Sequence, residues 1–257
     1  MQASSTGFAW ANGINLYYEI YGSGSPLILI HGGGSSGIFD FAETIRHLSD
    51  RYCLITIDLQ NHGRSEHRYE PETFLQDARD IVAVMDRLEI GKASFFGFSN
   101  GASTVLLLAQ LFPQRVEKII AASGLSNRAG MMDGFFEGMQ QATLDHMPAY
   151  LQENLLKQTP DPDKLQNMFL RDSQRMLHFT DWDDELLQSI TAPSLFISGD
   201  RDVIKPEHTV AMSKLVPDSR ILIVPAGHGS YMMADEQGQA DQVLIATTMQ
   251  HIARFLG

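Results

Sequence analysis

"FFGFSNGAS", residues 95–103, places Ser99 between Gly97 and Gly101 directly after an apolar run. The run has the composition of a buried strand, and the residues after the second glycine have helical spacing. A serine at such a junction sits on a sharp turn at the end of a strand, with the N-terminus of a helix behind it. Glycines at positions 97 and 101 remove side chains that would collide across so tight a turn. The stretch therefore predicts a strand, a tight turn carrying a nucleophilic Ser99, and a helix.

A second stretch, "GGSSG" at 33–37, matches the same short pattern around Ser35. Three glycines, however, separate Ser35 from the end of the preceding apolar run, and this spacing is typical of an open loop. The glycines of "HGGG" at 31–34 leave backbone N–H groups accessible, as a loop that binds an oxyanion requires. We therefore predict that Ser99, and not Ser35, is the nucleophile.

Strand-like and helix-like segments alternate along most of the chain. Two short strands joined at Asn12-Gly13 come first, since both residues tolerate the positive φ of a tight hairpin. Buried strands are then predicted at 26–30, 51–59, 92–98, 115–123, 193–199 and 220–225. Helices are predicted at 38–48, 71–90, 101–112, 207–216 and 239–256, with Pro71 in the first turn of the second. This alternation predicts an α/β fold, with a mostly parallel central sheet flanked by helices on both faces.

Residues 126–188 interrupt the alternation. The segment is rich in methionine and reads as short helices separated at Pro148, Pro160 and Pro162. Long insertions of this kind often form lids, and flexible Met side chains suit an adaptable apolar surface. We therefore expect a core domain of residues 1–125 and 189–257 and a helical cap of residues 126–188; a helical insertion that packs its own small core is the alternative.

The composition excludes several partners. The formal net charge is −12 and no basic block occurs, so we expect no nucleic-acid partner. Cys53 is the single cysteine, so no disulfide forms within the chain. The first residues lack the pattern of a signal peptide, and the longest apolar stretches are strand-sized. We expect a cytoplasmic protein, a monomer or homodimer, with no membrane contact. No metal or cofactor motif is found, and neither is predicted.

Five short motifs, taken together, resemble those of the α/β-hydrolase family, in particular its compact esterases, lactonases and carbon–carbon hydrolases with a helical cap. They follow the family order across nearly the whole chain: "HGGG" (31–34), "DLQNHGRS" (58–65), "GFSNG" (97–101), "SGDRD" (198–202) and "AGHG" (226–229). The family's usual "RGHGRS" contains Gln60 and Asn61 here, a departure that touches no expected catalytic residue.

The resemblance implies a catalytic triad. Ser99 would be the nucleophile, and His228, on the glycine-flanked loop after the last strand, would be the base. The acid usually stands three residues after a glycine at the end of a late strand, which indicates Asp202. Asp200 competes for this role, although it is closer to the strand and could instead cap the turn.

The same resemblance implies an oxyanion hole made of the backbone N–H groups of Gly33 and Asn100, with Gly34 competing with Gly33. Further contacts with substrate are expected from His31, Gly34, Phe98 and His178. The other expectation for His31 is that it orients the glycine loop, and for His178 that it packs in the cap or faces solvent.

The resemblance implies a hydrolase of a carboxylic ester or lactone with an apolar acyl part, acting through an acyl-enzyme intermediate. One alternative is a carbon–carbon hydrolase on the same triad, which would need Arg128, Arg171 or Arg175 to hold a substrate carboxylate, although surface placement is the default expectation for each. Thioesterase and peracid-forming activities remain open. A non-catalytic ligand-binding homologue is the alternative from another class. Epoxide hydrolases and haloalkane dehalogenases carry an aspartate where Ser99 stands and are disfavoured.

Overall fold

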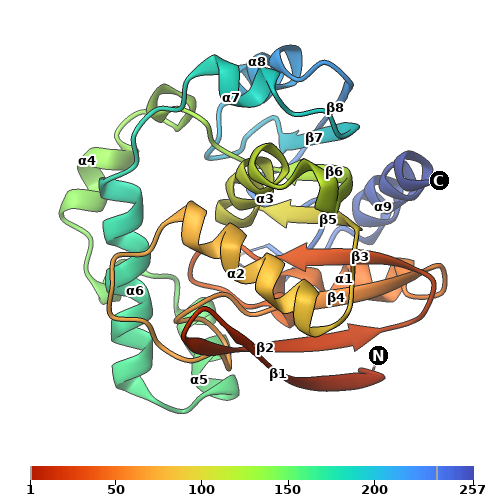
Figure 1. The fold of residues 1–257 in the computed structure, drawn as a ribbon. Helices are drawn as coiled ribbons and strands as arrows, with labels where there is room; N and C mark the ends of the chain where they lie inside the picture. Colours follow the sequence, from red (N-terminus) through yellow and green to blue (C-terminus); the bar gives the residue numbers. More distant parts are fainter. Residues whose placement is uncertain (1, 236) are drawn as a thin grey trace.

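The computed structural model describes residues 2–235 and 237–257, and its central element is an eight-stranded sheet (Figure 1). The strand order is β1-β2-β4-β3-β5-β6-β7-β8. β1 and β2 pair antiparallel with their neighbours, and all pairs from β4 through β8 are parallel. The predicted α/β class with a mostly parallel sheet is confirmed.

The strands are β1 (Ser5–Ala11), β2 (Ile14–Tyr21), β3 (Ser25–Ile30), β4 (Tyr52–Ile57), β5 (Ala93–Phe98), β6 (Val116–Ala122), β7 (Ser194–Gly199) and β8 (Ser219–Val224). The α-helices are α1 (Gly37–Leu48), α2 (Phe74–Arg87), α3 (Asn100–Leu111), α4 (Phe135–Gln140), α5 (Ala149–Gln158), α6 (Pro162–Leu177), α7 (Asp184–Gln188), α8 (Pro206–Leu215) and α9 (Gln242–Leu256). Short 3-10 turns occur at Pro113–Arg115, Arg128–Gly130 and Leu144–His146.

The hairpin between β1 and β2 turns at the two residues named from the sequence. Ala11 pairs with Ile14, so Asn12 and Gly13 form a two-residue loop. Their φ angles are 47° and 104°, which a tight hairpin requires. The hairpin places β1 at one edge of the sheet.

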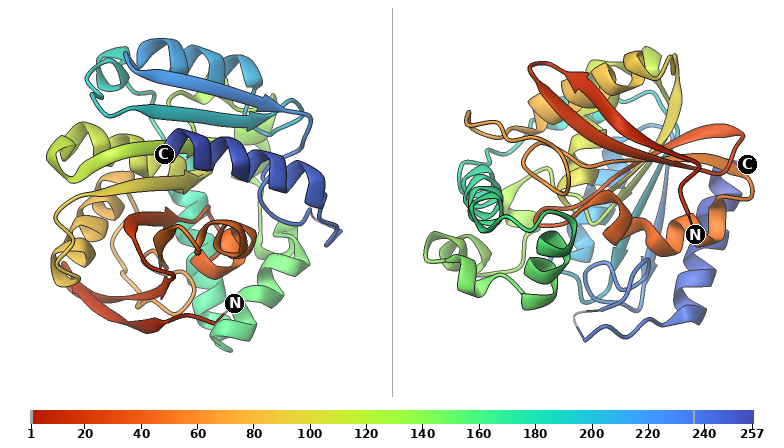
Figure 2. Two further views of the ribbon diagram at one scale, coloured as in Figure 1. Left: turned by 90° about the vertical axis from the view of Figure 1, so that its right-hand side faces the viewer. Right: turned by 90° about the horizontal axis from the view of Figure 1, so that it is seen from below.

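Two apolar cores lie on opposite faces of the sheet because the parallel strands bury side chains on both sides. Helices α2, α3 and α8 cover one face, where Ile28, Phe95 and Val105 are buried. Helices α1 and α9 pack together on the other face, over Leu29 and Phe96. Figure 2 shows α9 lying across this second face.

The chain between β6 and β7 crosses the carboxyl ends of the parallel strands. Helices α4, α5 and α6, here called the cap helices, lie beside that edge of the sheet in Figure 1. The last helix of the expected cap range, α7, instead packs against α3 and α8, and its Leu187 joins the core of the first face. The part of residues 126–188 that lies over the sheet edge is therefore the part carrying the cap helices.

Helix α2 differs from its predicted start. Thr73 is the N-cap, and its side chain accepts a hydrogen bond from Gln76 N at 3.1 Å. Pro71 therefore precedes the helix and is not in its first turn. Across residues 2–235 and 237–257, no helix combines the length and apolar character needed to cross a membrane.

Candidate active site

Ser99 occupies a strained turn between β5 and α3. Its φ is 53° and its ψ is −119°, a conformation that costs energy for a residue with a side chain. A Cβ at Gly97 would lie 2.2 Å from Gly101 O, and one at Gly101 would lie 2.1 Å from Ile30 O. The close approach of α3 to β5 and β3 therefore requires both glycines. Ser99 projects its side chain at the carboxyl edge of the sheet because of this turn.

His228 connects Ser99 to a buried carboxylate. Its Nε2 lies 3.2 Å from Ser99 Oγ and its Nδ1 lies 2.7 Å from Asp202 Oδ1. The Asp202 carboxylate can only accept, so Nδ1 carries the proton and Nε2 is free to accept from the serine hydroxyl. The imidazole also packs on the ring of Phe98, with centroids 4.8 Å apart. The structure thus brings together all three residues predicted for the triad.

The side chain of Asp202 is fully buried and accepts several hydrogen bonds. Burial raises its pKa, but the hydrogen bond and charge of His228, together with the Ser123 hydroxyl and Ile204 N–H, outweigh burial and lower it. Asp200 has a different role: its side chain is about half exposed and accepts a hydrogen bond from Ala226 N–H at 2.9 Å. Asp200 therefore braces the loop, as its position near the strand end suggested.

Two residues beside the Asp202 carboxylate were not predicted from the sequence. Ser123 Oγ lies 2.5 Å from Asp202 Oδ2, and Tyr231 OH lies 2.7 Å from Ser123 Oγ. Ser123 has a φ of 53° directly after β6. The only signal in the sequence is its place at the end of a predicted parallel strand, where carboxyl ends meet at one edge of the sheet.

The glycine loop after β3 is held on both sides of Gly33. Gly32 N–H donates to Asp40 Oδ2 at 2.8 Å, and Gly34 N–H donates to Asp172 Oδ2 at 2.6 Å. Within residues 2–235 and 237–257, no protein acceptor is found for Gly33 N–H. Asn100 is the first residue of α3, so its N–H has no acceptor within the helix. Gly33 and Asn100 thus keep N–H groups that a substrate oxygen can use.

Ser35, the competing serine, has a structural role. Its side chain is buried, and Oγ donates to Asp40 Oδ1 at 2.5 Å. Burial raises the pKa of Asp40 to about 6 against the lowering effect of the Ser35 and Gly32 hydrogen bonds. Ser35 therefore holds the carboxylate that in turn holds Gly32.

A cavity of about 400 Å³ opens in front of Ser99 and His228. Gly33, Gly34 and Asn100 line it at the sheet edge. Most of the other lining side chains are apolar and come from the cap helices and their neighbours: Leu125, Met131, Phe135, Met139, Met147, Leu151, Met168, Phe169, Met176, Val203 and Ile204. The cavity can enclose a small, largely apolar molecule next to the serine.

The remaining residues expected to contact substrate lie elsewhere. His31 is fully buried; its Nδ1–H donates to Gly32 O at 2.7 Å and its Nε2 accepts from Leu59 N–H at 2.9 Å. Burial lowers the pKa of His31 to about 3, so the ring is neutral and orients the glycine loop. Phe98 packs behind His228 and does not line the cavity.

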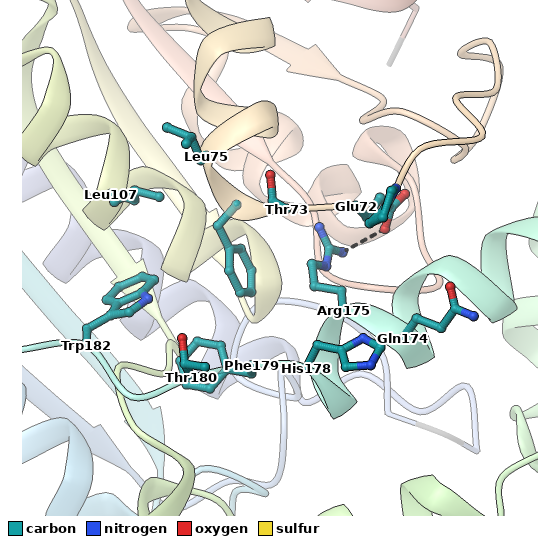
Figure 3. A pocket seen from close by; sticks show the side chains of 12 residues that line it. Glu72, Thr73, Leu75, Leu107, Gln174, Arg175, His178, Phe179, Thr180 and Trp182 are labelled. Atoms are coloured by element: carbon teal, nitrogen blue, oxygen red, sulfur yellow. Dashed lines mark ion pairs between the residues drawn. The ribbon is translucent and has the colours of Figure 1, made fainter.

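His178 lines a separate cavity of about 480 Å³, between the start of α2 and the end of α6 (Figure 3). This second cavity is also lined by Thr73, Phe179 and Trp182, but not by Ser99 or His228. His178 is therefore not placed to contact a substrate bound at Ser99.

None of the three arginines considered for a substrate carboxylate lines the cavity at Ser99. Arg171 lies 3.4 Å from Asn167 Oδ1, and the guanidinium of Arg128 stacks on Phe136 at 3.5 Å. Arg175 is buried, so its expected surface placement is wrong: it pairs with Asp77 at 2.7 Å and with Asp172, and Figure 3 shows it directed toward Glu72.

His62, which is buried, pairs with Asp172, whose side chain is 13% exposed; the sequence did not reveal this pair. His62 Nε2 lies 2.9 Å from Asp172 Oδ2 and Nδ1 lies 2.8 Å from Gln60 O. Burial opposes the charged ring, but Asp172 outweighs it and raises the pKa of His62 to about 9. The only sequence signal was the place of His62 in "NHGRS". In the described part of the chain, no three His, Cys, Asp or Glu side chains are arranged to hold a metal ion.

The comparisons with known proteins agree with this fold. The family described as the alpha/beta hydrolase fold matches residues 25–166, more than half of the chain. The chain belongs to this family, and its relatives include several named hydrolases, so it is an α/β-hydrolase enzyme.

Individual relatives include a human serine hydrolase, BPHL, which is 24% identical over 88% of this chain and 81% of the relative. A zearalenone hydrolase of Cladophialophora bantiana is 44% identical over 41% of each chain. Among solved structures, a meta-cleavage product hydrolase from Pseudomonas fluorescens superimposes with a TM-score of 0.80, covering 99% of this chain and 97% of that one. At 19% identity this last similarity shows the fold alone.

Proposed function

We propose that this enzyme hydrolyses a carboxylic ester or lactone through a Ser99–His228–Asp202 triad and an acyl-enzyme intermediate. The observation that carries the proposal is the chain of contacts from Ser99 Oγ to His228 Nε2 and from His228 Nδ1 to Asp202, at 3.2 and 2.7 Å. A serine hydroxyl becomes an effective nucleophile when a base in the right tautomer accepts its proton.

In the proposed reaction, Ser99 Oγ attacks the carbonyl carbon while His228 Nε2 takes the hydroxyl proton. The negative charge on the carbonyl oxygen is stabilised by the N–H groups of Gly33 and Asn100. His228 then gives its proton to the leaving alkoxide as the C–O bond breaks. A water molecule, deprotonated by His228, attacks the acyl-enzyme and releases the carboxylic acid and Ser99. Asp202 stabilises the imidazolium that forms in both halves of the reaction.

The cavity supports this substrate class. Its methionine, leucine and phenylalanine side chains favour an apolar acyl group, and its volume of about 400 Å³ suits a small molecule. Zearalenone, which appears in the name of one relative, belongs in a test panel for this reason.

The carbon–carbon hydrolase is the second candidate, and it ranks below the first. A keto acid substrate needs a cationic group to hold its carboxylate, and the three candidate arginines lie outside the cavity. Asp172 lines the cavity as well, but it is paired with His62 and Arg175 and offers no free cation for such a carboxylate.

Labelling with a fluorophosphonate probe, followed by peptide mapping, tests the proposal. The adduct is expected on Ser99, and Ser99→Ala is expected to abolish both labelling and hydrolysis of p-nitrophenyl esters. Ser35→Ala should lower activity far less, since Ser35 acts through Asp40. An adduct on Ser35, or equal losses in both variants, would contradict the assignment. Tight binding of esters or lactones without turnover would favour a ligand-binding protein.

A further inference from the structure

The glycine loop lies between two carboxylates that come from different parts of the molecule. Asp40 belongs to α1 in the core and binds Gly32 N–H, whereas Asp172 belongs to cap helix α6 and binds Gly34 N–H. The N–H of Gly33, between them, is left for a substrate oxygen. One of the two groups that fix the oxyanion loop is therefore supplied by the cap helices.

Asp172 packs closely against the backbone of the glycine loop. A Cβ at Gly33 would lie 2.9 Å from Asp172 Oδ2 and 2.6 Å from Asn100 Nδ2. The carboxylate thus lies against the backbone of the loop, and it also lines the cavity that contains Ser99. No water-sized gap separates Asp172 from the N–H that it binds at 2.6 Å.

Two cations keep the Asp172 carboxylate ionised and oriented. His62 Nδ1 faces Gln60 O and Nε2 faces Asp172 Oδ2, as expected for a doubly protonated ring. Nε2 also lies 3.2 Å from Gly34 N, but Gly34 N is closer to Asp172 Oδ2, at 2.6 Å. Arg175, one turn along α6, pairs with Asp172 Oδ1 and is itself held by Asp77 and by Glu72, as Figure 3 shows for the latter. An ionised carboxylate accepts a backbone hydrogen bond more strongly than a neutral amide.

We propose that Asp172 is a positioning residue that completes the oxyanion hole from the cap: by holding Gly34 N–H, it fixes the backbone so that Gly33 N–H faces the reacting carbonyl. The hole is then fully formed only while α6 is docked on the core. This inference rests on the proposed function, because it assigns Asp172 to the transition state of that reaction.

Other bonds dock α6 independently of Asp172. Lys164 Nζ donates to Ser65 O at 2.6 Å, and Asn167 Nδ2 contacts His67 Nδ1 at 2.8 Å. Thr159, just before the helix, donates to Gly63 O at 2.8 Å. Truncating Asp172 should therefore leave the helix in place and release only the loop. Lys164→Met instead removes one docking bond of the helix and leaves the Asp172 side chain unchanged.

The test compares Asp172→Ala and Asp172→Asn with two control variants. Asp163→Asn makes the same chemical change at an exposed position of α6, and Lys164→Met reports on docking. With a p-nitrophenyl ester, kcat should fall about 100-fold in Asp172→Ala and about tenfold in Asp172→Asn, whose amide oxygen can still accept from Gly34. KM should stay within about twofold, and Asp163→Asn should match the wild type. Added formate should restore at least about tenfold of the kcat lost in Asp172→Ala.

Amide exchange supplies a readout that does not depend on turnover. If Asp172→Ala is poorly folded, Asp172→Asn still provides the test, because it preserves the shape of the side chain. Hydrogen–deuterium exchange in the peptide spanning 31–37 should accelerate in both Asp172 variants and not in Asp163→Asn. Unchanged exchange, a kcat within twofold of the wild type, or a loss in Asp172→Ala that formate does not restore would overturn the inference. If Ser99→Ala keeps its activity, the proposed function fails, and the exchange result alone then decides whether Asp172 holds the loop.

Discussion

At the scale of single residues, two aspartates two positions apart have separate tasks. Asp200 accepts from Ala226 N–H on the surface, while Asp202 is buried against His228. We expect Asp202→Asn to lower kcat by about 10³ to 10⁴, because an amide cannot hold the required tautomer of the imidazole. Asp200→Asn should cost about 1 kcal/mol of stability or less and leave kcat within about twofold. Ester hydrolysis and urea unfolding of the two variants check this, and comparable kcat losses would contradict it.

The buried imidazole of His62 should make stability depend on pH. Its pKa in the folded protein is about 9, above the value of about 6.5 expected in the unfolded chain. The folded state therefore binds more protons, so the His62 contribution is complete below about pH 6.5 and is lost as pH rises through about 9. We expect the free energy of unfolding to fall by roughly 1 kcal/mol per pH unit between pH 7.5 and 9, with a flatter slope in His62→Gln.

Neighbouring groups do not obscure this window. Glu72, across Arg175 from His62, has its pKa raised to about 7 by burial. Its titration therefore lowers the free energy of unfolding mostly before the window from pH 7.5 to 9 begins. His31, which faces the His62 ring at 4.9 Å, stays neutral throughout. An equal slope in the wild type and in His62→Gln would show that the pair with Asp172 is not what titrates.

Single residues were predictable only where a local pattern marked them. Ser99, Asp202 and His228 each follow a strand in a glycine-containing motif, and the structure brings them together. Asp40 and Asp172 act through contacts with the glycine loop from 8 and 138 residues away. An acidic residue on a helix usually faces solvent, so nothing in the sequence separates these two from the other carboxylates.

At the scale of elements, the turn between β5 and α3 tolerates no added atom. Gly101→Ala would place a Cβ 2.1 Å from Ile30 O, and that backbone cannot move without disturbing β3. We expect a loss of at least about 3 kcal/mol in unfolding free energy, at or above the usual cost of overpacking. Gly138→Ala in α4, where no atom lies within 4 Å of the new Cβ, should instead stabilise by roughly 0.5–1 kcal/mol. Thermal unfolding of both variants measures the contrast, and a stable Gly101→Ala would contradict it.

The hydrophobic periodicity of the sequence predicted most helices and strands. It did not predict where each element ends or which other elements it packs against. The buried runs 26–30 and 92–98 became β3 and β5 because parallel strands read as continuous apolar stretches. The start of α2 shifted from Pro71 to the residue after Thr73, since the threonine side chain caps the first turn. Helix α7 lies within the insertion by sequence yet packs on the core, a long-range contact that no local pattern encodes.

At the scale of the whole molecule, the cavity exists because the cap helices close over the carboxyl edge of the sheet. Met139, half-buried in α4, lines it, whereas the exposed Met132 does not. Met139→Trp should fill part of the space and lower kcat/KM for an octanoyl ester about tenfold or more, with the acetyl ester within about twofold. Met132→Trp is the matched control. A parallel decrease for both esters, or none, would contradict the cavity as the acyl site.

The strands that carry the insertion also determine how it relates to the sheet. β6 and β7 are neighbours, with Ile119 opposite Ser194 and Ala122 opposite Ile197, although more than 70 residues separate each pair in the chain. The exit and re-entry points of the insertion therefore lie one strand apart, so its length has no bearing on the register of the sheet. We therefore expect that the cap helices can be shortened, extended or exchanged, with a change in substrate selection, while the core that holds Ser99 and His228 keeps its structure. The same exchange would remove Asp172 and leave His62 Nε2, 3.2 Å from Gly34 N, as the acceptor for that N–H. If Asp172 positions the loop as proposed, we expect a transplanted cap that lacks a carboxylate at this place to give a less active enzyme.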